Sequence, residues 1–258
     1  MAEIVDGEIH APNTRPAPVL GPFEAAKTAV DALLALVYPP RCVLCGGYTH
    51  DHLCADCAGD LLIPLPEPIC EICGHPRKGN PCLGCKTDPP QFDAARAASL
   101  YAGDVKDIIH GFKYHDRPQL AAPLGKLLAA QCEEFRYSLG NLEFDIVTAV
   151  PMHPLRKRRR GFNQSERLAR VVAAEFLAPY DPSLLVRAHF TRPQVGLKHD
   201  ARITNMRHAF SIGKVDVVGK TILVIDDVST TGATLRGCAS VLKAAGAKSV
   251  YGLTLAAG

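Results

Sequence analysis

The sequence has no long hydrophobic run and little net charge, and both absences narrow its class. No apolar stretch approaches the roughly 20 residues of a membrane-spanning helix, so we expect no membrane span. The first residues, Met-Ala-Glu-Ile-Val-Asp-Gly-Glu, are acidic and lack the basic region and apolar core of a secretory signal peptide. A formal charge of +3 over 258 residues is too small to indicate a particular partner. We therefore expect a cytoplasmic protein whose cysteines stay reduced.

The ten cysteines then need an explanation other than disulfide bonds. Eight of them form four CxxC pairs: Cys42/Cys45, Cys54/Cys57, Cys70/Cys73 and Cys82/Cys85. Eight residues separate the first pair from the second, and eight separate the third from the fourth, so CxxC-x8-CxxC occurs twice. Four thiolates per site match tetrahedral zinc, and we expect two structural Zn²⁺ ions, one on each repeat.

Two alternatives for these cysteines stay open in the sequence. Interleaved pairing, of the first CxxC with the third and the second with the fourth, would also form two sites. An iron–sulfur cluster would use the same thiolates, although regular pairs with a short spacer are more typical of zinc ribbons. His50, His52 and His75 are further candidate ligands, but surface positions suit them better because the thiolates already complete two sites. The isolated Cys132 and Cys238 are expected to be small core residues.

Composition divides the chain into four parts. Residues 1–22 are rich in proline and polar side chains without periodicity, which predicts a disordered tail. Residues 23–40 have apolar side chains at helical spacing and end at two prolines, which predicts a helix. A double zinc ribbon is expected over 41–88, and residues 89–258 alternate between strand and helix patterns.

This alternation predicts an α/β domain with a mostly parallel sheet covered by helices on both faces. The expected strands are 94–101, 144–150, 221–225 and 249–255, with short strands at 185–190 and 210–212, and the expected helices are 105–112, 120–137, 163–176 and 235–245. In such sheets ligands bind beyond the carboxyl ends of the strands, where the loops after Val150 and Ile225 lie.

The segment after the 221–225 strand has the most specific pattern in the chain. It consists of Asp226, Asp227, Val228, Ser229, Thr230, Thr231, Gly232, Ala233 and Thr234. A strand that ends in small residues and opens a helix aims backbone N–H groups and the helix dipole at one point, which suits a phosphate. The two acids can accept hydrogen bonds from adjacent sugar hydroxyls if the chain turns there, because successive strand residues face opposite sides. The plainer alternative is an Asp-rich helix cap.

This order of residues resembles the loop of type I phosphoribosyltransferases that binds 5-phosphoribosyl 1-pyrophosphate (PRPP). No Gly-Lys-Ser/Thr follows the strand, so the segment is not a Walker A loop, and it is not a GxGxxG turn. The resemblance implies that Asp226 and Asp227 hold ribose hydroxyls while residues 229–234 bind the 5′-phosphate.

The segment after the 144–150 strand is the expected second loop of this site. Residues 156–160 are five consecutive cations, and Gly-Phe-Asn-Gln follows them. Beside the acidic loop, these cations would face a second anionic group, such as the pyrophosphate of PRPP. The candidate anion-binding residues are Pro151, Met152, Arg156, Arg158, Arg159 and Lys113. Two alternatives stay open: a solvated basic face, and a site for single-stranded nucleic acid in which Phe162 stacks on a base.

Residues 191–210 form a polar segment, broken by Pro and Gly, between these two loops. A long polar insertion inside an α/β domain is typical of a lid or binding loop, and an ordinary surface excursion is the alternative. Its candidate ligand-contacting residues are Gln194, Arg202 and Asn205.

Taken together, these motifs resemble the ComF family of competence proteins from about Phe23 to the end of the chain. The matching features are the double zinc ribbon after Pro-Pro-Arg-Cys, Phe112-Lys113-Tyr114, Arg-Arg-Gly-Phe-Asn-Gln, the 194–210 block and the PRPP loop. Thr191-Arg-Pro-Gln is a departure, because members often carry Thr before the Pro.

The ComF resemblance implies a type I phosphoribosyltransferase fold and binding of Mg²⁺–PRPP, with a role in nucleotide metabolism or DNA uptake. The alternative is a non-catalytic adaptor that binds single-stranded DNA. No catalytic side chain is assigned, and the acceptor is not indicated. We expect no glutaminase activity, because residue 2 is Ala and 258 residues leave no room for such a domain.

Overall fold

The computed structural model describes residues 39–76, 78–114, 117–187 and 209–258. Two compact units, Met1–Pro40 and Arg41–Gly258, divide the chain, and every element below belongs to the second. The predicted tail, most of the helix predicted over 23–40, and the segment with Gln194, Arg202 and Asn205 lie outside the described residues.

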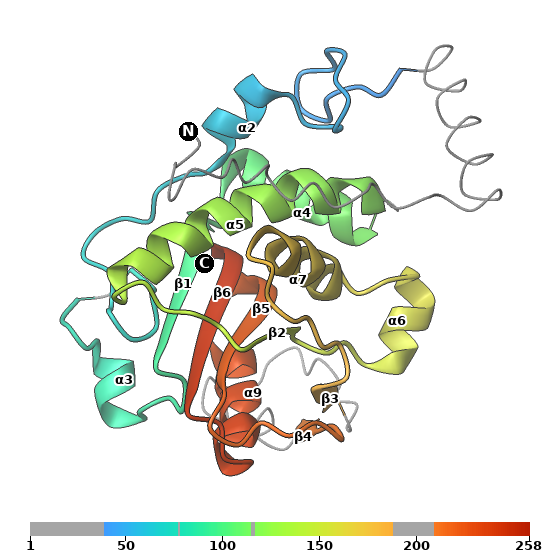
Figure 1. Ribbon diagram of the computed structural model, residues 1–258. Coiled ribbons are helices and arrows are strands. Elements are labelled where there is room, and N and C mark those ends of the chain that lie inside the picture. The colour runs from blue at the N-terminus through green and yellow to red at the C-terminus, as the bar shows by residue number, and fades with distance from the viewer. Residues whose placement is uncertain (1–38, 77, 115–116, 188–208) are drawn as a thin grey trace, which may run out of the picture. The chain divides into compact units, whose positions relative to one another are not determined.

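A four-stranded parallel sheet forms the centre of this unit, as the alternating sequence pattern predicts (Figure 1). Its strands are β1 (Ala94–Leu100), β2 (Ile146–Ala149), β5 (Thr221–Ser229) and β6 (Ser249–Ala257). They lie in the order β1-β6-β5-β2, so the two longest strands are central. All their carboxyl ends therefore meet at one edge of the sheet, which is where α/β proteins place ligands.

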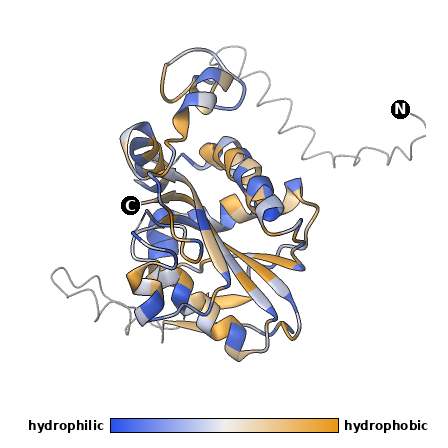
Figure 2. Cartoon of the chain, turned by 90° about the vertical axis from the view of Figure 1, so that its left-hand side faces the viewer, coloured by the Kyte–Doolittle hydropathy of each residue, from blue (hydrophilic) through white to orange (hydrophobic). Residues whose placement is uncertain are grey.

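Helices cover both faces of the sheet (Figure 1). One face packs against α4 (Gly103–Tyr114), α5 (Ala121–Ser138) and α7 (Gln164–Glu175), and the other against α9 (Ala233–Ala244) and the antiparallel pair β3 (Leu185–Arg187) and β4 (Phe210–Ile212). Along β5, Leu223 and Ile225 belong to the first core, whereas Ile222 and Val224 belong to the second. Burial on both faces explains why residues 222–225 of β5 are an unbroken apolar run, while the helices mix hydrophobic and hydrophilic residues (Figure 2).

The cysteine-rich region is packed onto the same unit. It contains the short helices α2 (Ala55–Leu61) and α3 (Leu83–Thr87). The Ile63 N–H donates to Ser99 Oγ at 2.8 Å, and the Leu100 N–H donates to the Ile63 carbonyl at 2.8 Å, so the chain after α2 pairs with the end of β1. The remaining helical elements are η1 (Pro118–Leu120) and α6 (Pro154–Arg160). None of the helices in the described segments has the length and apolar composition needed to cross a membrane.

Two local predictions were wrong. Residues 151–161 are not a loop throughout, because Pro154 opens α6, the His153 side chain caps it, and Gly161 ends it with φ 82°. The strand predicted over 221–225 continues to Ser229, because β6 pairs with it as far as Ala257. No turn therefore occurs at Asp226 and Asp227.

Candidate ligand site and zinc centres

Two groups of four cysteines are assembled in the cysteine-rich region. The first cluster is Cys42, Cys45, Cys54 and Cys57, and the second cluster is Cys70, Cys73, Cys82 and Cys85. Within each, the four Sγ atoms lie within 4.8 Å of one another, so the pairing is sequential and the interleaved alternative is excluded.

The sulfur geometry fits a single tetrahedral zinc ion in each cluster. The Sγ atoms of Cys45 and Cys54 are 3.8 Å apart, and those of Cys73 and Cys82 are 3.9 Å apart. Zn–S bonds of about 2.3 Å at tetrahedral angles require about 3.8 Å between sulfurs. A multi-iron cluster would hold its cysteines farther apart, so each cluster fits one four-coordinate ion such as zinc, held by four thiolates.

The thiols of the second cluster also show why a cation is needed there. Burial alone would raise the pKa of Cys70, but hydrogen bonds from the backbone N–H groups of Cys82, Cys73 and Ile72 lower this pKa to about 6. Burial and the charges of Cys73 and Cys70 raise the pKa of Cys85. One thiolate thus opposes ionisation of the next, and a bound dication removes that opposition.

The acidic pair lies near the carboxyl end of β5, with its side chains in different surroundings. Asp226 Oδ1 accepts hydrogen bonds from Ser165 Oγ and from the Asp227 N–H, each at 2.9 Å. Asp227 Oδ1 instead pairs with Lys113 Nζ on α4 at 2.9 Å. Because the strand continues through both acids, the turn expected to bring them to one face is absent. Asp226 has a neutral partner, whereas a cation neutralises Asp227.

Asp226 is the carboxyl group with the more unusual surroundings. Burial raises its pKa to about 7, and the charge of Asp227 acts in the same direction. The hydrogen bonds from Ser165 and from the Asp227 N–H, and the charge of Lys113, act in the opposite direction but do not cancel the rise. A carboxyl that changes charge near neutral pH at the ligand edge of a parallel sheet is typical of a functional site.

Residues 229–234, which we call the phosphate loop, run from the last residue of β5 into the first turn of α9. Gly232 has φ 71°, a left-handed conformation that favours glycine, and α9 begins at the next residue. The N–H groups of Thr230, Thr231 and Gly232 donate no hydrogen bond to any other described residue. Free donors at the start of a twelve-residue helix suit an anion.

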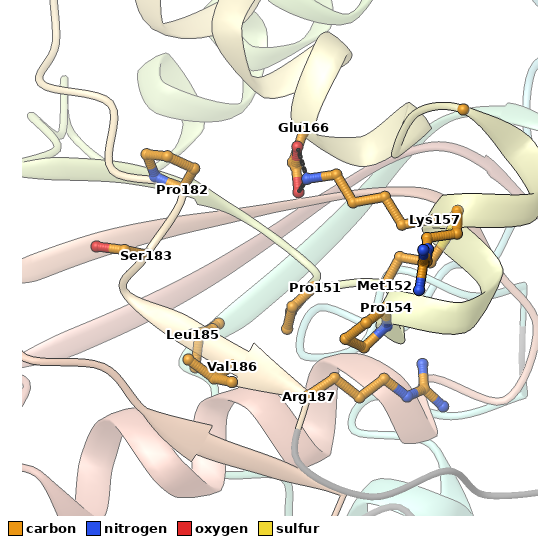
Figure 3. Close-up of a pocket in the computed structure, with 12 residues that line it drawn as sticks. Pro151, Met152, Pro154, Lys157, Glu166, Pro182, Ser183, Leu185, Val186 and Arg187 are labelled. Atoms are coloured by element: carbon orange, nitrogen blue, oxygen red, sulfur yellow. Dashed lines mark hydrogen bonds and ion pairs between the residues drawn. The ribbon is translucent and has the colours of Figure 1, made fainter.

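A cavity of about 530 Å³ lies between α6 and β3 (Figure 3). It is lined by Pro151, Met152, Pro154, Lys157, Arg158, Gly161, Glu166, Pro182, Ser183, Leu185, Val186 and Arg187. Figure 3 shows Lys157 reaching Glu166, to which it is paired at 2.9 Å, with Arg187 on the opposite side. Burial lowers the pKa of Arg187, Arg156 adds to this effect and Asp226 opposes it, so Arg187 lies within range of the charge of Asp226.

The cations of α6 are not equivalent. Arg160 donates to Gln164 Oε1 at 2.8 Å and lies 4.9 Å from the centre of the Tyr114 ring, so it supports the packing of α6. Arg158 and Arg159 are exposed and make no ion pair with the described residues. They are the members of the run best placed to meet a ligand.

The structure thus brings some predicted residues together and separates others. Pro151, Met152 and Arg158 line the cavity, Arg156 and Arg159 are exposed on α6, and Lys113 belongs with Asp227. Ser165 was not predicted as a site residue, although it follows Gly-Phe-Asn-Gln directly and is positioned at the start of α7 by the Asn163 cap. Arg187 was not predicted either, because it has no motif around it.

The parallel sheet, its flanking helices and the paired four-cysteine sites define a phosphoribosyltransferase-type fold with an N-terminal double zinc ribbon. Residues 33–90 match the double zinc ribbon domain, and residues 149–258 match the phosphoribosyl transferase domain. The DNA utilization protein YhgH of Salmonella typhimurium LT2 is 30% identical over 83% of this chain and 96% of that protein. Competence protein F of Haemophilus influenzae is 26% identical over 84% of this chain and 97% of that protein. Competence protein ComFC of Streptococcus pneumoniae is 26% identical over 79% of this chain and 86% of that protein. The chain belongs to the ComF family.

Proposed function

We propose that this protein binds Mg²⁺–PRPP, or a closely related phosphoribosyl ligand, at the carboxyl edge of β5. The observation that carries the proposal is the free N–H donors of the phosphate loop, which follow shortly after a half-buried carboxyl with a raised pKa. An anion receptor beside carboxylate acceptors suits a molecule that carries a phosphate and a pair of hydroxyls on one sugar.

Different residues of the site bind different groups of the ligand. The N–H groups of Thr230, Thr231 and Gly232 hold the 5′-phosphate, with Thr234 adding a hydroxyl. Asp226 accepts from the ribose hydroxyls, while Asp227 stays paired with Lys113. Arg158 and Arg159 face the pyrophosphate, whose charge Mg²⁺ neutralises when it is bound. Transfer to an acceptor would need no protein nucleophile, because positioning and charge neutralisation at the leaving group supply the acceleration. Pyrophosphate release in a screen of bases and amines tests this step.

Arg158→Ala is expected to weaken Mg²⁺–PRPP binding roughly tenfold, the size of one lost charge-assisted hydrogen bond. The melting temperature should stay within a few degrees, because an exposed arginine without an ion pair contributes little to folding. Lys248→Ala, which removes an exposed cation at the amino end of β6, is the matched control and should leave affinity unchanged. Equal Mg²⁺–PRPP affinity of wild type and Arg158→Ala would indicate that the cations of α6 only face solvent and do not bind the ligand.

Single-stranded DNA is the second candidate ligand, and the exposed Arg158 and Arg159 favour it. The relatives are named for DNA utilization and competence, which agrees with a role in DNA uptake. DNA binding should weaken steeply with salt, since each neutralised phosphate releases counterions. If it persists without PRPP and is reduced in Arg159→Ala, the adaptor function is supported. Absence of DNA binding at low salt would leave PRPP as the ligand.

A further inference from the structure

His75 is buried between the second cluster and the first residue of the phosphate loop. Its Nδ1 atom lies 3.0 Å from the Cys73 carbonyl oxygen, and its Nε2 atom lies 3.3 Å from Ser229 Oγ and 3.3 Å from the Ser229 carbonyl oxygen. A carbonyl only accepts, so Nδ1 donates to the Cys73 carbonyl, while Nε2 either donates to the Ser229 carbonyl or accepts from the Ser229 hydroxyl, according to its protonation. One ring therefore joins the backbone of a zinc ligand to the phosphate loop.

Arg236 makes a second link at the other end of the loop. It lies in the first turn of α9, where its N–H donates to the Gly232 carbonyl at 2.9 Å. Its guanidinium donates to the Asp88 carbonyl at 2.6 Å, and its NH2 atom lies 3.7 Å from Cys85 Sγ. The phosphate loop is thus held by the second cluster at its start and just after its end.

The second cluster is itself fixed firmly to the sheet. Gly74 has φ 67°, and a Cβ atom there would collide with the Ala95 carbonyl oxygen, so the Cys70–Cys73 turn lies directly against β1. The Ala95 N–H donates to the Ile72 carbonyl at 2.7 Å. Among the described residues, the first cluster makes no hydrogen bond to residues 229–236. The two zinc sites therefore differ in their relation to the phosphate loop.

We propose that zinc in the second cluster sets the conformation of the phosphate loop through His75 and Arg236, so that ligand binding depends on this zinc and not on the other. His75 acts as a positioning residue. The proposal rests on the proposed function for its ligand, but the loop conformation can be measured without any ligand.

His75→Leu keeps an apolar side chain of similar size and removes both hydrogen bonds, while leaving all eight cysteines in place. We expect two zinc ions per chain and Mg²⁺–PRPP affinity reduced about three- to tenfold, the effect of one or two lost hydrogen bonds. His75→Gln, whose amide oxygen occupies the position of Nε2, should recover part of the affinity. His50→Leu, at an exposed histidine beside the first cluster, is the matched control and should bind like wild type.

Hydrogen exchange in the free protein separates this proposal from the proposed function. The Gly258 N–H donates to the Ser229 carbonyl and the Arg236 N–H to the Gly232 carbonyl, so these two amides report on both ends of the loop. Both should exchange faster in His75→Leu, and in Cys82→Ser, which loses one zinc. Failure of wild type to bind PRPP would defeat the proposed function only. Unchanged exchange and unchanged affinity in zinc-replete His75→Leu would overturn the coupling.

Discussion

Asp226→Asn is expected to stabilise the free protein at pH 8 while weakening Mg²⁺–PRPP binding ten- to a hundredfold. Burial raises the folded pKa of Asp226 to about 7, whereas the ordinary value is 3.8. Between these values the folded state holds a proton that the unfolded state has released, so stability falls as pH rises from 4 to 7. Because asparagine does not ionise, Asp226→Asn avoids this loss, and its free energy of unfolding above pH 7 should exceed that of wild type by on the order of 2 to 4 kcal/mol.

The loss of affinity in this variant has a separate cause. Asparagine keeps an oxygen for Ser165 but removes the charge that strengthens hydrogen bonds from ribose hydroxyls, each worth about 1.5 to 3 kcal/mol. Inorganic phosphate, which has no hydroxyl pair, should still bind the phosphate loop. For wild type, PRPP affinity should rise from pH 6 to pH 8 as Asp226 ionises. Thermal melts and titrations with PRPP and phosphate, at both pH values, test the account, and equal losses for the two ligands would contradict it.

Asp227→Asn is the matched comparison, because the same change is made in a different environment. Asp227 forms an ion pair with Lys113 at 2.9 Å, and both side chains are largely buried. Removing one partner leaves a cation without its counter-charge, so this variant should lose stability. Opposite signs for the two stability changes would support the assignment of different partners to the two acids.

Cys70→Ser is expected to reduce the zinc content from two ions per chain to one and to lower the melting temperature by roughly 10 °C. Cys70 is fully buried, and its cluster is attached to β1, His75 and Arg236, so loss of the ion disturbs more than a surface module. Cys132→Ser, at an equally buried cysteine outside both clusters, is the control for the chemical change. Metal analysis and thermal melts check the pair, and one zinc or any iron in wild type would contradict the two-site account.

Much of the fold was predictable because its signals are local. The repeated CxxC spacing identified both zinc sites, and the apolar run before Asp226 identified the central strand. The structure differs from the sequence-based predictions where contacts between residues far apart in the sequence determine the local conformation. Pairing with β6 extends β5 past both acids, and a local sequence pattern carries no information about that partner.

The candidate site was less predictable than the sheet for the same reason. His75 and Ser229 are 154 positions apart, and Ser165 and Asp226 are 61 apart, so neither contact follows from spacing. Lys113 was grouped with the α6 cations because of its charge, yet the sheet places it beside Asp227. A single side chain without a motif, such as Arg187, can be recognised as a candidate site residue only when the structure shows the cavity that it lines.

Calorimetric titration of the zinc-replete wild-type chain with Mg²⁺–PRPP at pH 8, repeated with Asp226→Asn, tests the central claim most directly. The account predicts saturable binding with one ligand per chain, weakened at least tenfold by the substitution and competed by inorganic phosphate. Absence of saturable binding in wild type, or the same affinity in both proteins, would contradict it.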